Sequence, residues 1–383
     1  MKISRSLRSM YSIGFLLSVQ TALLSYSNSS FLNQYFKEQY TGLIYSAAAL
    51  LTMIALILLP KIISRIGSRK NMIGMGLMII GMCIINAIAP HPAAVAVAFC
   101  LLFATNTAFF LASDIVIDQI AEPETMGHTR GHYLTAVNLG YVFAPAISGF
   151  VLSRMGFSAL FTVAGMAIVP VLIFVFHTPN FQNTHASKVH IWKSLVALWR
   201  HPDLRNIVVA NFILQFFYAW MVIYTPIYLH KDLGIPWDAI GNIFSLMLFA
   251  FILTQIPFGN LADKYLGEKK LLILGFLTMG FSTMAMFFLP FITLPLLAFV
   301  LFCTRVGASC VEVMTESYFF KKVSKDETGA MSIFRNAYPA AYLVAPVLAA
   351  PIVAFAPTQW LFLILGIICI LGVFFIIPIR DTK

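Results

Sequence analysis

The chain has 383 residues, of which 60% are hydrophobic and only 10% carry a charge. Soluble globular proteins have about 25% charged residues, so this composition excludes a soluble enzyme or binding domain and indicates a membrane protein. The net charge of +10 could suggest a nucleic acid or an acidic protein as partner, but the placement of the basic residues argues against both.

Runs without charge predict the membrane spans. No Asp, Glu, Lys or Arg occurs over 71–113, 271–304 or 336–379. One helix crosses a bilayer with roughly 20 residues, so the first and last of these runs each hold two spans joined by a turn. The predicted spans are 9–30, 39–60, 71–90, 93–119, 130–153, 157–177, 207–229, 239–262, 270–290, 293–319, 331–355 and 359–379. The short alternating segments of a membrane barrel are not seen, so the predicted fold class is an all-α membrane protein with twelve transmembrane helices.

The basic residues predict the topology. Of the 25 Lys and Arg residues, 20 lie at the termini or in alternate loops, whereas the opposite loops hold only three. Loops on the cytoplasmic side are enriched in Lys and Arg, so both termini are expected to be cytoplasmic. We expect an integral protein of a bacterial cytoplasmic (inner) membrane, with the lipid bilayer as partner, no nucleic acid, and a monomeric state.

Four short matches repeat at a nearly constant offset of 198–201 residues. They are GLIYS from Gly42 with GNIFS from Gly241, Gly67 with Gly267, Asp114/Asp118 with Glu312/Glu316, and Ala144-Pro145 with Ala345-Pro346. Such self-similarity indicates a duplicated architecture. The predicted organisation is a six-helix bundle over 1–177, a cytoplasmic linker over 178–206, and a second six-helix bundle over 207–383.

The second copy of one match resembles the cytoplasmic signature of the major facilitator superfamily. The segment from Gly259 to Lys270 reads GNLADKYLGEKK, whereas the first copy has Pro60 and Ser64 where the signature has Gly and Asp. The stretch with Gly140, Pro145 and Gly149 also resembles a degenerate antiporter motif, or it is a close-packing motif of small residues. The resemblance implies that a substrate binds near the midplane between the two bundles, which expose it alternately to each side.

Six ionisable residues stand out within the predicted spans, where a charge near the bilayer centre costs about 2.5–3.5 kcal/mol. They are Asp114, Asp118, Arg305, Glu312, Glu316 and Arg335. The expected substrate or coupling residues are Asp114, Arg305, Glu312 and Arg335. Arg305, Glu312 and Glu316 are spaced i, i+7 and i+11, so they share one helix face. Arg305 near the midplane is expected to pair with Glu312, because a guanidinium forms forked hydrogen bonds with carboxylates and phosphates.

The resemblance also implies a cytoplasmic gate, in which carboxylates pair with basic residues and glycines let helices approach. Asp263 is expected to pair with basic or backbone groups, and Gly259 to permit a close helix contact. The expected gate residues are Arg65, Gly67, Arg69, Asp118, Arg130, Gly259, Asp263, Gly267 and Glu316.

Polar and aromatic residues on four spans are expected to line a cavity, although each can instead form an interhelical packing contact. They are Gln20, Tyr26, Asn28, Asn138, Tyr141, Asn211, Gln215, Tyr218, Trp220, Asn336, Tyr338 and Tyr342.

The sequence therefore predicts a secondary active transporter that moves a small organic solute by alternating access, coupled to protons. Alternatives are a translocase or exporter of lipids or amphipathic drugs, and a non-transporting membrane receptor on the same fold. Loops are too short for an enzyme domain, and no phosphate loop, nucleophile elbow or metal-ligand spacing appears. No enzymatic activity, cofactor or metal is expected.

Overall fold

The structure is a computed structural model that describes residues 5–88, 91–121, 126–181, 201–291, 293–323 and 328–381. Within these ranges every regular element is a helix. Most of the predicted linker over 178–206 lies outside the described residues, because the described chain stops at Phe181 and resumes at His201. The chain divides into two compact units.

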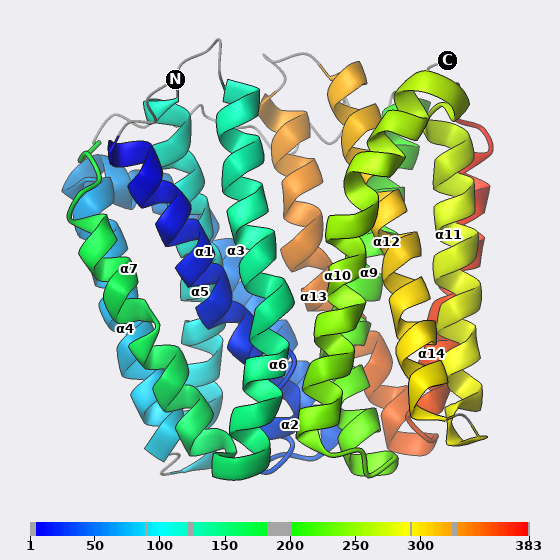
Figure 1. Cartoon of the computed structure of the whole chain (residues 1–383), viewed down its shortest axis with the longest axis horizontal. Helices are drawn as coiled ribbons and strands as arrows, with labels where there is room; N and C mark the ends of the chain where they lie inside the picture. The colour runs from blue at the N-terminus through cyan, green and yellow to red at the C-terminus, as the bar shows by residue number, and fades with distance from the viewer. Residues whose placement is uncertain are drawn as a thin grey trace. The chain divides into compact units, whose positions relative to one another are not determined.

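The first unit comprises the chain up to Ala186 together with Gly234–Ser245. Its helices are α1 (Arg5–Ser25), α2 (Asn28–Leu32), α3 (Glu38–Ile66), α4 (Ser68–Ile88), α5 (Pro92–Ile120), α6 (Met126–Met166) and α7 (Ile168–Val175). α1 packs along α6, α5 packs against α3 and α4, and α7 packs against α1 and α4 (Figure 1). A bend at Gly156, with a φ of 77°, divides α6 into two helices.

The second unit comprises Ser187–Leu233 and Leu246–Lys383. Its helices are α9 (Pro202–Ile227), α10 (Trp237–Leu261), α11 (Glu268–Ala285), α12 (Leu294–Lys322), α13 (Thr328–Phe355) and α14 (Gln359–Ile376), with the short elements η2 (Tyr228–Asp232), η3 (Ala262–Leu266) and η4 (Met286–Phe291). α9 packs against α13 as α1 packs against α6, and α11 packs against α12 and α14 as α4 packs against α5 and α7.

The predicted fold class is confirmed. Ten helices among the described residues are long and apolar enough to cross a membrane. One of the ten, Thr129–Val175, contains the bend at Gly156 and therefore provides two spans. α1 adds another, because its 21 residues measure about 32 Å at 1.5 Å per residue. The chain thus has twelve transmembrane helices in two pseudo-repeated six-helix bundles.

Small residues allow one very close helix contact in the first unit. A Cβ built on Gly149 of α6 would lie 2.9 Å from the Cα of Gly241, and the reverse distance is the same. The backbone N–H of Ala146 donates to the Ser245 hydroxyl over 3.0 Å. The packing explanation of Gly149 therefore has direct structural support.

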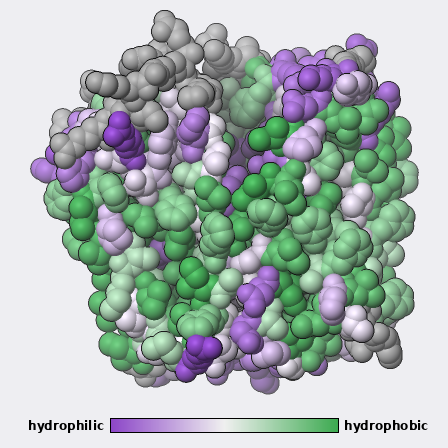
Figure 2. All heavy atoms as spheres, in the orientation of Figure 1, coloured by the Kyte–Doolittle hydropathy of each residue, from purple (hydrophilic) through white to green (hydrophobic). Residues whose placement is uncertain are grey.

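The face shown in Figure 2 is covered mainly by apolar side chains at mid-height, for example over α11 and α12, while hydrophilic side chains gather toward the helix ends. Leu274 and Phe281 of α11 and Phe299 of α12 are among the exposed large hydrophobic residues. Contiguous exposed apolar area marks a membrane or protein contact. Together with the ten apolar helices, it indicates an integral membrane protein.

Candidate functional site

α12 carries the charged residues that spacing placed on one helix face. Arg305 is only 1% exposed, Glu312 is half-buried, and Glu316 is exposed. The helix begins at Leu294 with Pro295 in its first turn, where a missing N–H costs no hydrogen bond. Arg305 therefore sits about three turns into a long apolar helix, deep within the second unit.

Two aromatic rings of α9 hold the Arg305 guanidinium. Its Cζ lies 5.3 Å from the Phe217 ring centre and 5.4 Å from the Tyr218 ring centre, which is the range of a cation–π contact. Among the described residues, neither Nε nor Nη2 of Arg305 has a hydrogen-bond partner. The guanidinium is thus packed but incompletely hydrogen-bonded.

Tyr218 connects Arg305 with Glu312. The Tyr218 hydroxyl donates a 2.8 Å hydrogen bond to Glu312 Oε2, while the face of its ring lies near the Arg305 guanidinium. The charges of Arg305 and Glu312 attract each other, but no direct ion pair joins them in the described part of the chain. The expected direct pair is therefore not formed among the described residues, and Tyr218 instead contacts both side chains in a three-residue cluster, Arg305–Tyr218–Glu312.

Two further charges of the second unit lie near this cluster. Glu316, one turn along α12, repels Glu312 and attracts Arg335 of α13. Arg335 and Glu316 are both exposed, so their attraction is screened more strongly than the attraction within the buried cluster.

The first unit has a different arrangement of charge. Arg130 donates from Nε to Asp118 Oδ1 over 2.9 Å, and its Nη2 is in contact with the same oxygen. Both side chains are exposed, at 37% and 43%. Asp114, half-buried one turn deeper on α5, also attracts Arg130. The expected contact between Asp118 and Arg130 is therefore formed, whereas its role in gating stays a prediction.

The loop between α3 and α4 is held by backbone hydrogen bonds. Gly67 has a φ of 86°, and the next residue, Ser68, exchanges hydrogen bonds with Phe181 through both its backbone and its hydroxyl. Arg69 donates from Nε to the Thr178 carbonyl over 2.8 Å. Arg69 thus binds the end of the sixth span rather than Asp118, and Arg65 is exposed.

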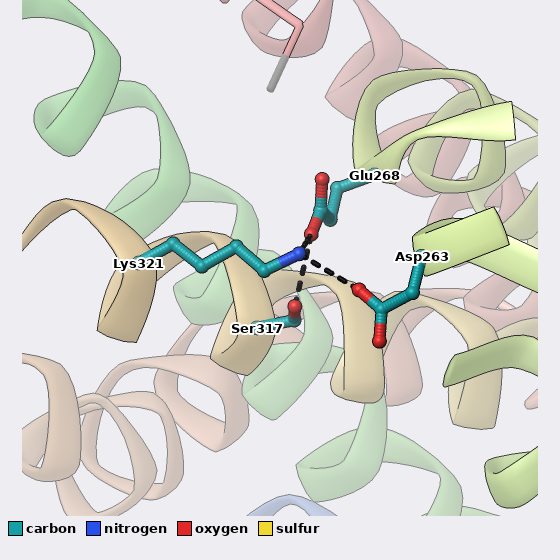
Figure 3. A network of polar contacts seen from close by, with 4 residues as sticks. All are labelled: Asp263, Glu268, Ser317 and Lys321. Carbon is teal, nitrogen blue, oxygen red and sulfur yellow. Dashed lines mark hydrogen bonds and ion pairs between the residues drawn. The ribbon is translucent and has the colours of Figure 1, made fainter. Parts of the chain in front are cut away.

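The equivalent loop in the second unit is held by ionic hydrogen bonds (Figure 3). Lys321, near the end of α12, lies 2.9 Å from Asp263 and also contacts Glu268. Ser317 donates a 3.0 Å hydrogen bond to Glu268, whose side chain is 1% exposed. Asp263 therefore has the expected basic partner, and Glu268 is a buried member that sequence reasoning assigned no role. Its place directly after the signature's Gly267 was the available signal.

The expected close helix contact at Gly259 is not formed among the described residues. A Cβ added there would meet none of their atoms within 4 Å. α10 makes its close approach at Gly241, five turns earlier. Gly267, in contrast, has a φ of 76°, and a Cβ there would overlap the carboxylate of Asp381.

The polar residues expected to line a cavity have varied surroundings in the first unit. Gln20 is fully buried beside Cys83, and Asn28 is 8% exposed. The Tyr26 ring lies 4.8 Å from the Phe244 ring. Asn138 and Tyr141 on α6 are half-buried. Three of the five, Gln20, Tyr26 and Asn28, are thus buried in the first unit.

The corresponding residues of the second unit include clear packing contacts. Asn211 donates to the Phe334 carbonyl over 3.0 Å, and Trp220 donates to the Ala345 carbonyl over 2.6 Å. Both bonds tie α9 to α13. Gln215 donates to Asn211 over 3.4 Å, the rings of Tyr338 and Tyr342 are 4.8 Å apart, and Asn336 is half-buried. Among the residues expected to line the cavity, Tyr218 contacts both Arg305 and Glu312.

Comparisons with known proteins agree with this architecture. The family model of the Major Facilitator Superfamily matches residues 10–241 and 225–383. An uncharacterised MFS-type transporter from Enterobacter sp. (strain 638) is 24% identical over 164 residues, which are 42% of this chain and 41% of the relative's length. A crystal structure of a peptide transporter, POT, in complex with sulfate superposes with a TM-score of 0.78 at 16% identity, covering 97% of this chain and 94% of that one. The nucleoside transporter NupG gives 0.77 at 12% identity, covering 97% and 98%. The family matches, the twelve spans and the duplicated bundles together show that the chain belongs to the Major Facilitator Superfamily.

Proposed function

We propose that the protein is a secondary active transporter that moves a small organic solute by alternating access and couples this movement to protons. Membership of the family and the twelve-span fold support a transporter. The coupling is inferred from one observation, which is that a half-buried carboxyl, Glu312, lies within a membrane span and is hydrogen-bonded to Tyr218. An ionisable group in a span is costly and marks a solute or proton pathway by default.

The chemistry of the cluster is suited to proton exchange. When Glu312 is ionised, the Tyr218 hydroxyl and the nearby positive charge of Arg305 stabilise it. When Glu312 binds a proton, its attraction to Arg305 is lost. The hydrogen bond from the Tyr218 hydroxyl is then made to a neutral carboxyl group and becomes weaker. Protonation therefore changes the interaction between α9 and α12, the two helices that carry the cluster.

The experiment is proton uptake by proteoliposomes in response to a panel of organic solutes, read with a pH-sensitive dye inside the vesicles. We expect at least one solute to drive proton movement in the unsubstituted protein and Glu312→Gln to remove that movement while solute counterflow persists. Asp238→Asn is the matched control, since Asp238 is an exposed carboxyl at the start of α10. Solute-driven proton uptake that is unchanged in Glu312→Gln would refute the coupling role.

A further inference from the structure

Arg305 presents an unusual arrangement of hydrogen-bond donors. The two nitrogens without a partner, Nε and Nη2, share one edge of the planar guanidinium, so their N–H bonds point in the same direction. A carboxylate matches such an edge with two parallel hydrogen bonds. The edge best suited to a carboxylate is therefore buried and has no hydrogen-bond partner among the described residues.

The surroundings of this edge make an anionic partner necessary. Arg305 is 1% exposed, and an unpaired buried charge is strongly unfavourable. Its aromatic neighbours, Phe217 and Tyr218, contact the guanidinium by cation–π geometry, which does not satisfy its N–H donors. Glu312, the carboxylate on the same face of α12, accepts a hydrogen bond from Tyr218 and not from Arg305.

The other carboxylates near this cluster and at the end of α12 interact with basic residues other than Arg305. Glu316 is attracted to Arg335, and Lys321 is bound to Asp263 and Glu268 near the end of α12. No described carboxylate of this unit is hydrogen-bonded to Arg305. A ligand carboxylate would supply what the protein itself does not.

We infer that Arg305 is the anion-binding residue of the transported solute and that this solute is an organic carboxylate, held through the Nε and Nη2 edge. Tyr218 positions both groups, because its ring packs on Arg305 while its hydroxyl holds Glu312 away from the guanidinium. This inference rests on the proposed function, since it names the substrate class of the same site.

The first experiment measures thermal stabilisation of the purified full chain in detergent by straight-chain monocarboxylates of two to eight carbons and by benzoate. The matching primary amides, including benzamide, and inorganic phosphate are the comparison probes. Hydrogen bonds to a charged group are worth about 1.5–3 kcal/mol, so we expect the best carboxylate to bind at least about tenfold more tightly than its amide. Equal effects of acid and amide across the series would overturn the inference, as would stabilisation by phosphate alone.

Variants test the edge itself. Arg305→Lys keeps the positive charge but has no planar edge, and we expect it to lose at least about tenfold in carboxylate affinity. Arg154→Gln is the matched control, because Arg154 is an exposed arginine of α6 over the Phe150 ring, and it should bind as the unsubstituted protein does. Arg305→Lys with unchanged carboxylate affinity would contradict the assignment, and the acid–amide comparison on the unsubstituted protein decides the question even if the variant does not fold.

The two proposals fail separately. Proton-coupled transport of neutral solutes, with no preference for carboxylates, would remove the inference and keep the proposed function. Carboxylate binding at Arg305 without any solute-driven proton movement would keep the inference about binding and remove the coupled transporter.

Discussion

Gly67 and Gly267 end equivalent helices 200 residues apart, and both have a positive φ, 86° and 76°. Each lies beside a polar side chain that follows the last helix of its own unit, Asn180 in the first and Asp381 in the second. The two units therefore close the same loop against the same place in the fold. The backbone conformation, which only glycine adopts readily, is common to both copies.

The side chains that hold the two loops differ in kind. In the first unit, Ser68 and Arg69 bind backbone groups of Phe181 and Thr178. In the second unit, Lys321 bridges Asp263 and the buried Glu268. The comparison teaches that the duplicated fold preserves the turn, while hydrogen bonds to the backbone and ion pairs between side chains can replace one another around it.

The units also differ at mid-span. Arg305 of α12 corresponds, at the offset of 198 residues that relates Glu312 to Asp114, to Thr107 of α5. The Thr107 hydroxyl donates to the carbonyl of Phe103 in its own helix. A permanent charge deep in a span is therefore a feature of the second unit, which is where function-specific chemistry is expected.

The largest expected difference between the units is in transport. Glu312→Gln should lower proton-coupled transport by about tenfold or more, since tenfold corresponds to only about 1.4 kcal/mol, and should flatten its pH dependence because the titrating group is gone. Asp114→Asn should have a smaller effect, because the position of the first unit that corresponds to Arg305 is the uncharged Thr107. Initial rates in proteoliposomes between pH 5.5 and 8.5 measure both. Equal losses would show that the two carboxyls share the coupling role.

The loop at Gly267, which is held by ion pairs, should lose more stability on substitution than the loop at Gly67, which is held by hydrogen bonds to the backbone. Lys321→Met would remove the ammonium partner of the buried Glu268 carboxylate, while the hydrogen bond from Ser317 remains. We expect a cost of about 1–2 kcal/mol, which is near the lower end for a buried group that loses a partner because Lys321 is 45% exposed. Thermal unfolding in detergent measures this change. Adding Glu268→Gln should recover part of the loss, because the stranded charge is then removed. No recovery would mean that Lys321 acts through packing.

The shared turn should respond alike in both units. Gly67→Ala and Gly267→Ala each place a Cβ where φ is positive, and we expect each to lower the free energy of unfolding by about 1 kcal/mol or slightly more. Gly81→Ala of α4 is the control, since a Cβ there meets nothing within 4 Å and alanine favours a helix. If only one of the two substitutions lowered the free energy of unfolding, the two turns would not be equivalent.

The smallest effect is expected at the surface of the first unit. Arg130→Ala removes an ion pair whose two members are both more than one-third exposed, and such pairs contribute about 0–1 kcal/mol. The change in unfolding temperature should therefore be smaller than that of Lys321→Met. A larger change would indicate that Asp114, which also attracts Arg130, contributes strongly to the contact.

Much of the fold could be predicted because hydrophobic length and repetition are local properties of the sequence. The boundary predicted between the spans 130–153 and 157–177 falls where Gly156 bends α6. Helical spacing also placed Arg305, Glu312 and Glu316 on one face. Spacing gives no register between helices, however, so the contact of Tyr218 with both Arg305 and Glu312 could not be foreseen.

Two features of the site could not be read from the sequence, and for the same reason. The burial of Glu268 beside Ser317 and Lys321 depends on where α12 ends relative to the loop. Arg69 was expected to bind a carboxylate, whereas the end of the sixth span offers it a carbonyl. A long side chain at a helix end can reach several partners, and the sequence alone does not give the distances to them.

α10 belongs to the first unit up to Ser245 and to the second unit from Leu246 onward. A polypeptide that stopped at the linker would therefore lack the segment that supplies Gly241 to Gly149, the Ser245 hydroxyl to the N–H of Ala146, and Trp237 to the ring of Phe157. The first bundle is therefore completed by a segment that follows the linker in the sequence.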